Sequence, residues 1–285
     1  MHPGVQRGRL TATAAVLTIS AVLAISAAPS VAAPGAFEVA RTITAPTVTA
    51  PTSAVEGTRF AVTARIPAAA RARTVTLQFH DKGQYDYQSI NTWTKKAVAP
   101  VNGRSKVTFH LRADTARETW FRAVVTYRGA ASTRSTSARV NYRHWFQLSD
   151  FSSYYHAGSA VDFVGFQMAG QSWNGWYVQA TTGETRYTLG SACNRLRATI
   201  GVLDSSDDGA TAEVTLATIA PGGAATAIYT SPNLAAGQTV SIDRALANPY
   251  RFSISGQDTT PAAVGGSQPV AHASVGDPEF LCHFN

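Results

Sequence analysis

The feature that most constrains this fold is an alternation of apolar and polar residues that recurs in short runs. It is clearest at residues 193–202, where Leu196, Ala198 and Ile200 alternate with polar or small residues. A period of two points successive side chains to opposite faces of a strand, so the pattern predicts a half-buried β-strand. The run ends at residues 204–209, an acidic, Ser- and Gly-bearing sequence that favours a turn.

Similar runs form two groups, and the charge changes sign between them. Short alternating runs separated by Gly-bearing turns fill residues 46–143, and about seven more follow in residues 144–285. Residues 41–143 contain 17 Lys and Arg against 5 Asp and Glu, whereas residues 144–285 contain 5 against 11. The sequence therefore predicts an all-β protein of two β-sandwich domains.

The N-terminus has the features of a secretory signal. Arg7 and Arg9 precede an uncharged apolar run, which is followed by small residues ending at Ala32. We expect a signal peptide at 1–32, a flexible lead-in at 33–45 and a secreted, extracellular mature protein. An uncleaved membrane anchor is the alternative. The mature chain has no run of about 20 apolar residues, so no membrane span is predicted there.

The expected export of the protein bears on whether its two cysteines are oxidised. In an oxidising compartment, Cys193 and Cys282 most simply form one disulfide bond. The bond would close a loop of about 90 residues. Two buried free thiols are the alternative.

The second half resembles a known family. The residues concerned are Tyr187-Thr188-Leu189-Gly190, Leu196-Arg197-Ala198 and Ile200-Gly201-Val202 before Asp204, then Tyr229-Thr230-Ser231 with Gly237, and Gly276-Asp277-Pro278 before Cys282. They are similar to the NPCBM family (novel putative carbohydrate-binding module), in the variant found as the last domain of secreted actinobacterial proteins. The resemblance implies a jelly-roll sandwich that binds glycans. The sequence departs from the family in two places. Residues 171–177 stand where the family has a Gly-rich segment that contains a histidine. Ala273 and Ser274 stand where the family has a tryptophan.

The first half resembles bacterial immunoglobulin-like domains, through Val55-Glu56-Gly57-Thr58, Val75-Thr76-Leu77-Gln78, Trp93 and Phe121-Arg122-Ala123-Val124. Its arginines fall mostly at outward strand positions. They indicate either a face for an anionic polymer or a solvated surface. No nucleic-acid recognition motif is present, so nucleic acid is not an expected partner.

The candidate binding residues form one aromatic segment. Trp173 and Trp176 flank Asn174 and Gly175, a turn-favouring pair that could present both rings outward beside Tyr177. Aromatic rings stack on the apolar faces of sugars, and an asparagine amide can bond hydroxyl groups. The sequence thus predicts a carbohydrate site at Trp173, Asn174, Trp176 and Tyr177. Packing of one ring into the core and of the other over a strand edge is the alternative.

The sequence contains no nucleophile elbow, zinc-protease motif, Cys-x-x-Cys pair or phosphate loop. We therefore expect no enzymatic activity, cofactor or metal site. The acidic residues Asp204, Asp207 and Asp208 could bind calcium, but a turn is the simpler role. The expected function is weak binding of a polysaccharide or cell-wall glycan. A structural or protein-interaction module and a secreted hydrolase with an unrecognised site are the alternatives.

Overall fold

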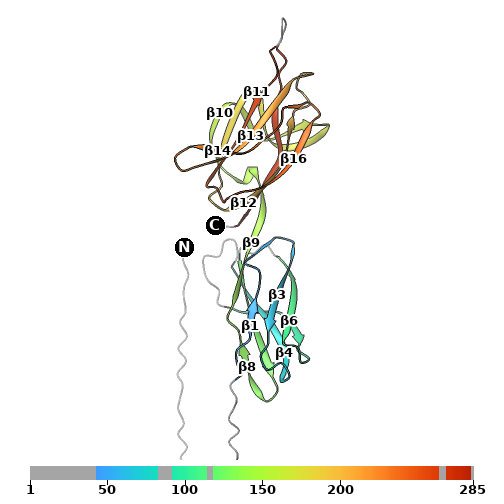
Figure 1. Cartoon of the computed structure of the whole chain (residues 1–285), viewed down its shortest axis with the longest axis vertical. Helices are drawn as coiled ribbons and strands as arrows, with labels where there is room; N and C mark the ends of the chain where they lie inside the picture. Colours follow the sequence, from blue (N-terminus) through green and yellow to red (C-terminus); the bar gives the residue numbers. More distant parts are fainter. Residues whose placement is uncertain (1–42, 83–91, 114–117, 263–267, 284–285) are drawn as a thin grey trace, which may run out of the picture. The chain divides into compact units, whose positions relative to one another are not determined.

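The protein is all-β, as the alternating pattern predicts. A computed structural model describes residues 43–82, 92–113, 118–262 and 268–283, and strands dominate them. In Figure 1 the strands up to β9 are blue to green, and those from β10 onward are yellow-green to red. No helix among these residues is long and apolar enough to cross a membrane. The predicted signal peptide lies outside the described residues.

The first nine strands enclose one hydrophobic cluster. β1, β3 and β6 form one antiparallel sheet, and β5, β4, β7 and β9 are neighbours in a second. Phe60 of β3 lies 6.0 Å from Phe121 of β7, ring centroid to ring centroid, so the two sheets pack face to face. The strands are β1 (Thr47–Thr49), β2 (Ser53–Val55), β3 (Arg59–Arg65), β4 (Ala72–Lys82), β5 (Thr94–Pro100), β6 (Lys106–Arg112), β7 (Glu118–Tyr127), β8 (Ala130–Arg134) and β9 (Ala138–Gln147).

The later strands enclose a second hydrophobic cluster. Phe252 of β17 and Phe280 of β18 meet edge to face at 5.2 Å between centroids, near its centre. A short 3-10 helix (Leu148–Asp150) precedes the strands β10 (Ser153–Met168), β11 (Gln171–Thr188), β12 (Cys193–Val202), β13 (Thr211–Ile219), β14 (Ala225–Thr230), β15 (Leu234–Ala235), β16 (Thr239–Ala245), β17 (Arg251–Asp258) and β18 (Ala273–His283).

A long hairpin joins the two sheets of this second cluster. β10 and β11 turn at Ala169 and Gly170, both of which have positive φ (53° and 71°). The first half of β11 pairs with β18, and its second half pairs with β17. We name the two sheets by these partners. The β18 sheet also contains β12 and β16, and the β17 sheet also contains β13 and β14.

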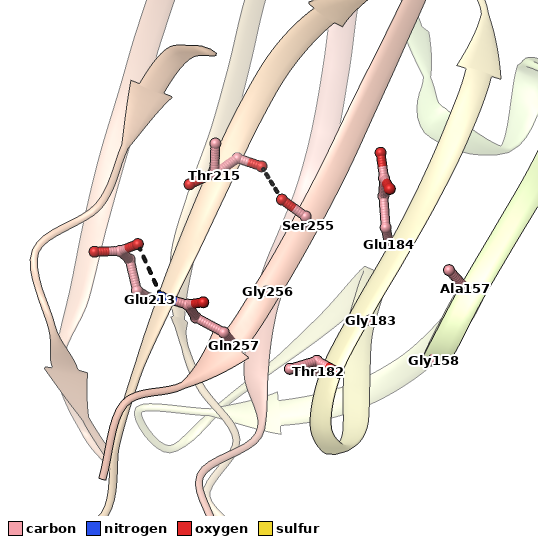
Figure 2. A pocket seen from close by; sticks show the side chains of 10 residues that line it. All are labelled: Ala157, Gly158, Thr182, Gly183, Glu184, Glu213, Thr215, Ser255, Gly256 and Gln257. Carbon is pink, nitrogen blue, oxygen red and sulfur yellow. Dashed lines mark hydrogen bonds between the residues drawn. The ribbon is translucent and has the colours of Figure 1, made fainter. Parts of the chain in front are cut away.

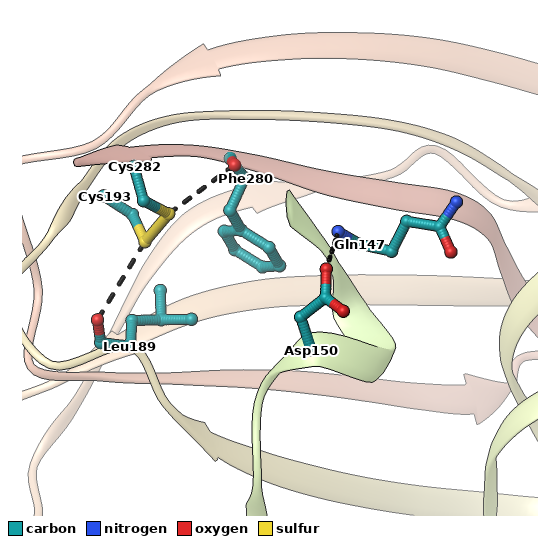
Figure 3. The surroundings of a disulfide bond; sticks show 6 residues. All are labelled: Gln147, Asp150, Leu189, Cys193, Phe280 and Cys282. Carbon is teal, nitrogen blue, oxygen red and sulfur yellow. Dashed lines mark hydrogen bonds between the residues drawn. A yellow bond between two sulfur atoms is a disulfide. The ribbon is translucent and has the colours of Figure 1, made fainter. Parts of the chain in front are cut away.

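The predicted disulfide is present. Cys193 at the start of β12 lies directly opposite Cys282 near the end of β18, and their sulfurs are bonded. Both residues are buried in the second cluster, and Figure 3 shows the bond beside Leu189 and Phe280. The bond therefore fixes the first residue of a central strand to the last strand of the fold.

The acidic segment after β12 is a turn, as predicted, and its side chains hold neighbouring backbone. The Asp204 carboxylate accepts a hydrogen bond from the Gly170 N–H at 2.9 Å. The Asp207 carboxylate accepts one from the Val270 N–H at 2.8 Å. These bonds satisfy amides of two other segments, so the turn organises the connections at this end of the sandwich.

The strand β9 crosses the predicted domain boundary at residue 144. Its first residues pair with β7, and its last residues, 143–147, pair with β18. The two hydrophobic clusters fall on either side of this boundary in the sequence. Residues 43–285 form a single contact unit, so the division into two separate domains stays a prediction.

Candidate functional site

The predicted aromatic site lies within β11 and not at a turn. Asn174 and Gly175 pair with Gly165 and Val164 of β10, in the interior of the long hairpin. Residues three apart in a strand point to opposite faces, so Trp173 and Trp176 lie on opposite sides of the sheet. The prediction that a turn presents both rings outward is wrong.

Trp176 belongs to the core. Its side chain is fully buried, and its indole N–H donates a hydrogen bond to the hydroxyl of Thr185 at 2.9 Å. Gly256 allows this packing, because a Cβ there would lie 3.1 Å from the Trp176 ring. A sugar cannot reach the ring, so Trp176 is removed from the predicted carbohydrate site.

Trp173 and Tyr177 are half-buried on the outer side of β11. The Trp173 ring covers Gly276, where a Cβ would come within 2.6 Å of it, and its N–H donates to the Met168 carbonyl at 3.1 Å. Tyr177 meets Phe166 edge to face at 5.8 Å between ring centroids. Both rings mainly cover neighbouring backbone and side chains, and each keeps part of its surface exposed.

Asn174 lines a small pocket of about 180 Å³. Its backbone N–H donates to the carboxylate of Asp277 at 3.1 Å, and Phe163, 43% exposed, lies at the same pocket. Asn174 is thus the predicted residue that lines this pocket. A carbohydrate-binding role for Trp173, Asn174 and Tyr177 stays a prediction.

A larger depression, of about 310 Å³, lies on the outer face of the β17 sheet (Figure 2). Four neighbouring strands form it in the order β10, β11, β17, β13. Strand register places Ala157, Glu184, Ser255 and Thr215 in one row across these strands. The next row contains Thr182, Gln257 and Glu213. Alternation explains why polar groups gather here, because the residues between them along β11, β13 and β17 are buried.

Hydrogen bonds orient the carboxylates of the depression. Arg186 donates from Nε and Nη2 to the two oxygens of Glu184, at 2.7 and 3.2 Å. Gln257 Nε2 donates to Glu213 at 3.5 Å, as Figure 2 shows. The hydrogen bond to Glu184 raises the pKa of Arg186 above its usual value, so this guanidinium stays charged. Each carboxylate has further lone pairs that can accept donors from a ligand.

Three partly exposed tyrosine rings lie further along the same sheet, outside the residues that line the depression. Tyr155 pairs with Arg186 in the strand register, and the Arg186 guanidinium lies 4.5 Å from the centre of its ring. The Arg251 guanidinium lies 4.6 Å from the centre of the Tyr154 ring and 5.7 Å from the centre of the Tyr250 ring. The three rings are 41–51% exposed, and they are among the most exposed large hydrophobic side chains of the described residues.

Sequence reasoning missed this depression, although part of the signal was present. Glu184, Glu213 and Gln257 are the polar members of alternating runs on β11, β13 and β17. The alternation predicts that each points outward. It does not give the strand order that brings them together, because strands so distant in the sequence have no predictable register.

Comparison with known proteins gives no family. The sequence matches no protein-family profile and no curated protein. Among solved structures, superoxide reductase (neelaredoxin) from Ignicoccus hospitalis shares 16% identity with a TM-score of 0.29, over 35% of this chain and 81% of that chain. The sulfur carrier protein SoxY from Chlorobium limicola f thiosulfatophilum shares 19% identity with a TM-score of 0.25, over 35% and 79%.

A structure from work on carbohydrate-binding modules of the β-sandwich superfamily shares 11% identity with a TM-score of 0.29, over 83% of this chain and 99% of that chain. TM-scores this low carry no argument about fold or function. The functional proposal therefore depends on the chain's own residues.

Proposed function

We propose that this is a secreted, non-catalytic protein that binds a polysaccharide or cell-wall glycan weakly through its NPCBM-like second half. The observation that supports it most is the depression on the outer face of the β17 sheet. There, carboxylate, amide and hydroxyl groups line one depression, and the partly exposed ring of Tyr155 lies one row further along the strands.

The chemistry of the depression suits sugar rings. A sugar presents many hydroxyl groups around an apolar ring face, so a matching site needs acceptors, donors and a flat apolar surface. Glu184 and Glu213 supply acceptors, the Gln257 amide supplies both an acceptor and donors, and Tyr155 supplies the ring. The arginine that pairs with Glu184 holds its carboxylate in place, which lowers the entropy lost on binding.

The disulfide bond agrees with the expected extracellular location. A disulfide between buried cysteines is typical of proteins that fold outside the reducing cytosol. Together with the basic and apolar N-terminal sequence, it supports export to a compartment where cell-wall and extracellular glycans are present.

A glycan array followed by calorimetric titration tests the proposal. The double variant Glu213→Ala/Gln257→Ala removes a carboxylate and an amide from the depression, and each lost ligand hydrogen bond is worth about 1 kcal/mol or more. We expect binding at least about tenfold weaker. The control Gln171→Ala removes an exposed amide at the start of β11, outside the depression, and this variant should bind like the parent protein.

The variant Asn174→Ala separates the depression from the pocket that contains the sequence-predicted residue. Full binding by Glu213→Ala/Gln257→Ala together with lost binding by Asn174→Ala would place the site at that pocket and contradict the depression. An array with no bound glycan would contradict the proposed function itself.

A further inference from the structure

A second surface combines aromatic rings with unneutralised positive charge. It lies on the outer side of the sheet that contains β5, β4, β7 and β9, and we call it the basic-aromatic face. On β7, Phe121 and Ala123 are buried in the first cluster, so Trp120 and Arg122 point outward. The face comprises His80, Lys82, Trp93, Lys95, Glu118, Trp120, Arg122, Arg134 and Arg139.

Three rings lie next to one another on this face. His80 and Trp120 are opposite residues of β4 and β7, and their ring centroids are 5.5 Å apart. Trp93, just before β5, lies 6.0 Å from His80 on its other side. All three side chains are partly exposed, and neighbouring rings are tilted by 45° and 37°, so together they form an uneven aromatic strip that a ligand can contact.

Arginines line the strip. The Arg122 guanidinium lies 4.1 Å from the centre of the Trp93 ring, and its Nε donates to the Gln78 side chain at 2.7 Å. The Arg139 guanidinium lies 5.6 Å from the centre of the Trp120 ring and pairs with Glu118. Ring contacts and hydrogen bonds thus hold both guanidinium groups, which reduces the entropy lost when they bind an anion.

Among the described residues, the positive charge of this face exceeds the negative charge. Five described cationic residues share the face with one described carboxylate, Glu118, which already pairs with Lys82 and Arg139. Among the described residues, neither Arg122 nor Arg134 forms an ion pair with a carboxylate. Burial and the nearby charge of Arg134 lower the pKa of Arg122, as expected where positive charges are close together.

We propose that the basic-aromatic face binds an acidic polysaccharide, with uronate rings stacked on the strip formed by Trp93, His80 and Trp120 and carboxylates paired with Arg122 and Arg134. This site is separate from the depression on the β17 sheet and binds a different class of glycan.

Rings and charges together select this ligand chemistry. A planar guanidinium can donate two parallel hydrogen bonds to a carboxylate, and an aromatic ring contacts the apolar face of a sugar. A polyphosphate chain offers the charge without a ring to stack. A neutral polysaccharide offers the ring without the charge. A uronate polymer provides both in every repeat.

Titration of the full-length protein with polygalacturonate tests the proposal. The double variant Arg122→Gln/Arg134→Gln should weaken binding by about tenfold or more, because charge-assisted hydrogen bonds are lost. Trp93→Ala should weaken it by about fivefold through lost stacking. The charge-matched control Arg65→Gln/Lys106→Gln removes two exposed cations from the opposite sheet and should change affinity by less than about twofold.

Thermal unfolding of each variant confirms that the surface substitutions leave the fold intact. The proposal would be overturned by a lack of polygalacturonate binding by the parent protein, by an equal loss in the charge-matched control, or by tight polyphosphate binding that Trp93→Ala does not affect. The last result would show a response to charge alone. Because dextran, a neutral glucan, lacks carboxylates, equal affinity for dextran would also overturn it.

Discussion

Removal of the Cys193–Cys282 disulfide should destabilise the second cluster and leave the first cluster almost unchanged. The cysteines are 89 residues apart in the sequence, and the segment between them contains β12 to β17 and most of β18. Loop-closure entropy for this separation is worth about 4–5 kcal/mol at 25 °C. The double variant Cys193→Ala/Cys282→Ala should therefore lose about that much stability in the second cluster.

Native-state hydrogen exchange measures this loss one strand at a time. Amides of β17, inside the closed loop, should show a free energy of opening about 4–5 kcal/mol lower in the variant. Amides of β4, in the first cluster, are the internal control and should change by less than about 1 kcal/mol. A loss below about 2 kcal/mol at β17 would refute the entropic argument. An equal loss at β4 would contradict the prediction of two separate domains.

Two further predictions concern the core of the second cluster. Trp176→Ala should cost about 3–5 kcal/mol in urea unfolding because it empties a fully buried site, whereas the half-buried Trp173→Ala should cost less than half as much. Burial and then the Asp162 charge raise the pKa of Tyr187 above its ordinary value of 10.0. The folded state therefore keeps the Tyr187 proton at a pH where the unfolded state loses it, and this stability is present below about pH 10 and lost as the pH rises further. Tyr187→Phe should thus lose less stability than the parent protein between pH 9 and 11, and equal losses would contradict the assignment.

Much of the fold could be predicted because burial imposes a period of two on the strands. The structure buries the apolar residues of two predicted strands. In β3 these are Phe60, Val62 and Ala64, and in β12 they are Leu196, Ala198 and Ile200. The disulfide followed from the number of cysteines and the expected compartment. These features depend on local pattern or on counting, so they need no knowledge of strand order.

The long hairpin could not be predicted in the same way. β10 and β11 contribute to both sheets, so their buried side changes along their length and no single alternation describes them. The actual turn is Ala169-Gly170, which lacks the Asn-Gly signal present at Asn174-Gly175. Gly175 serves instead for close approach, because a Cβ there would lie 2.2 Å from the Val275 carbonyl. Because a turn was predicted at Asn174-Gly175, the Trp176 ring was wrongly predicted to point outward.

The candidate sites were missed for a related reason. Glu184, Glu213 and Gln257 are distant in the sequence, and the register of three strands brings them into one depression. On the basic-aromatic face, the outward arginines were recognised, but their contacts with Trp93 and Trp120 depend on the pairing of β4 with β7. Strand order and register decide which outward side chains become neighbours on a sheet, and the local alternation of residues does not give either of them.

The proposed glycan site is the depression on the β17 sheet. Two-dimensional NMR of the ¹⁵N-labelled protein, titrated with an oligosaccharide of the glycan selected on the array, tests it most directly. We expect saturable shifts of the Gln257 side-chain amide and of the backbone amides of Thr182, Glu184 and Ser255, with the amides around Asn174 unchanged. Shifts gathered around Asn174 and Phe163, or no shifts at saturating ligand, would contradict it.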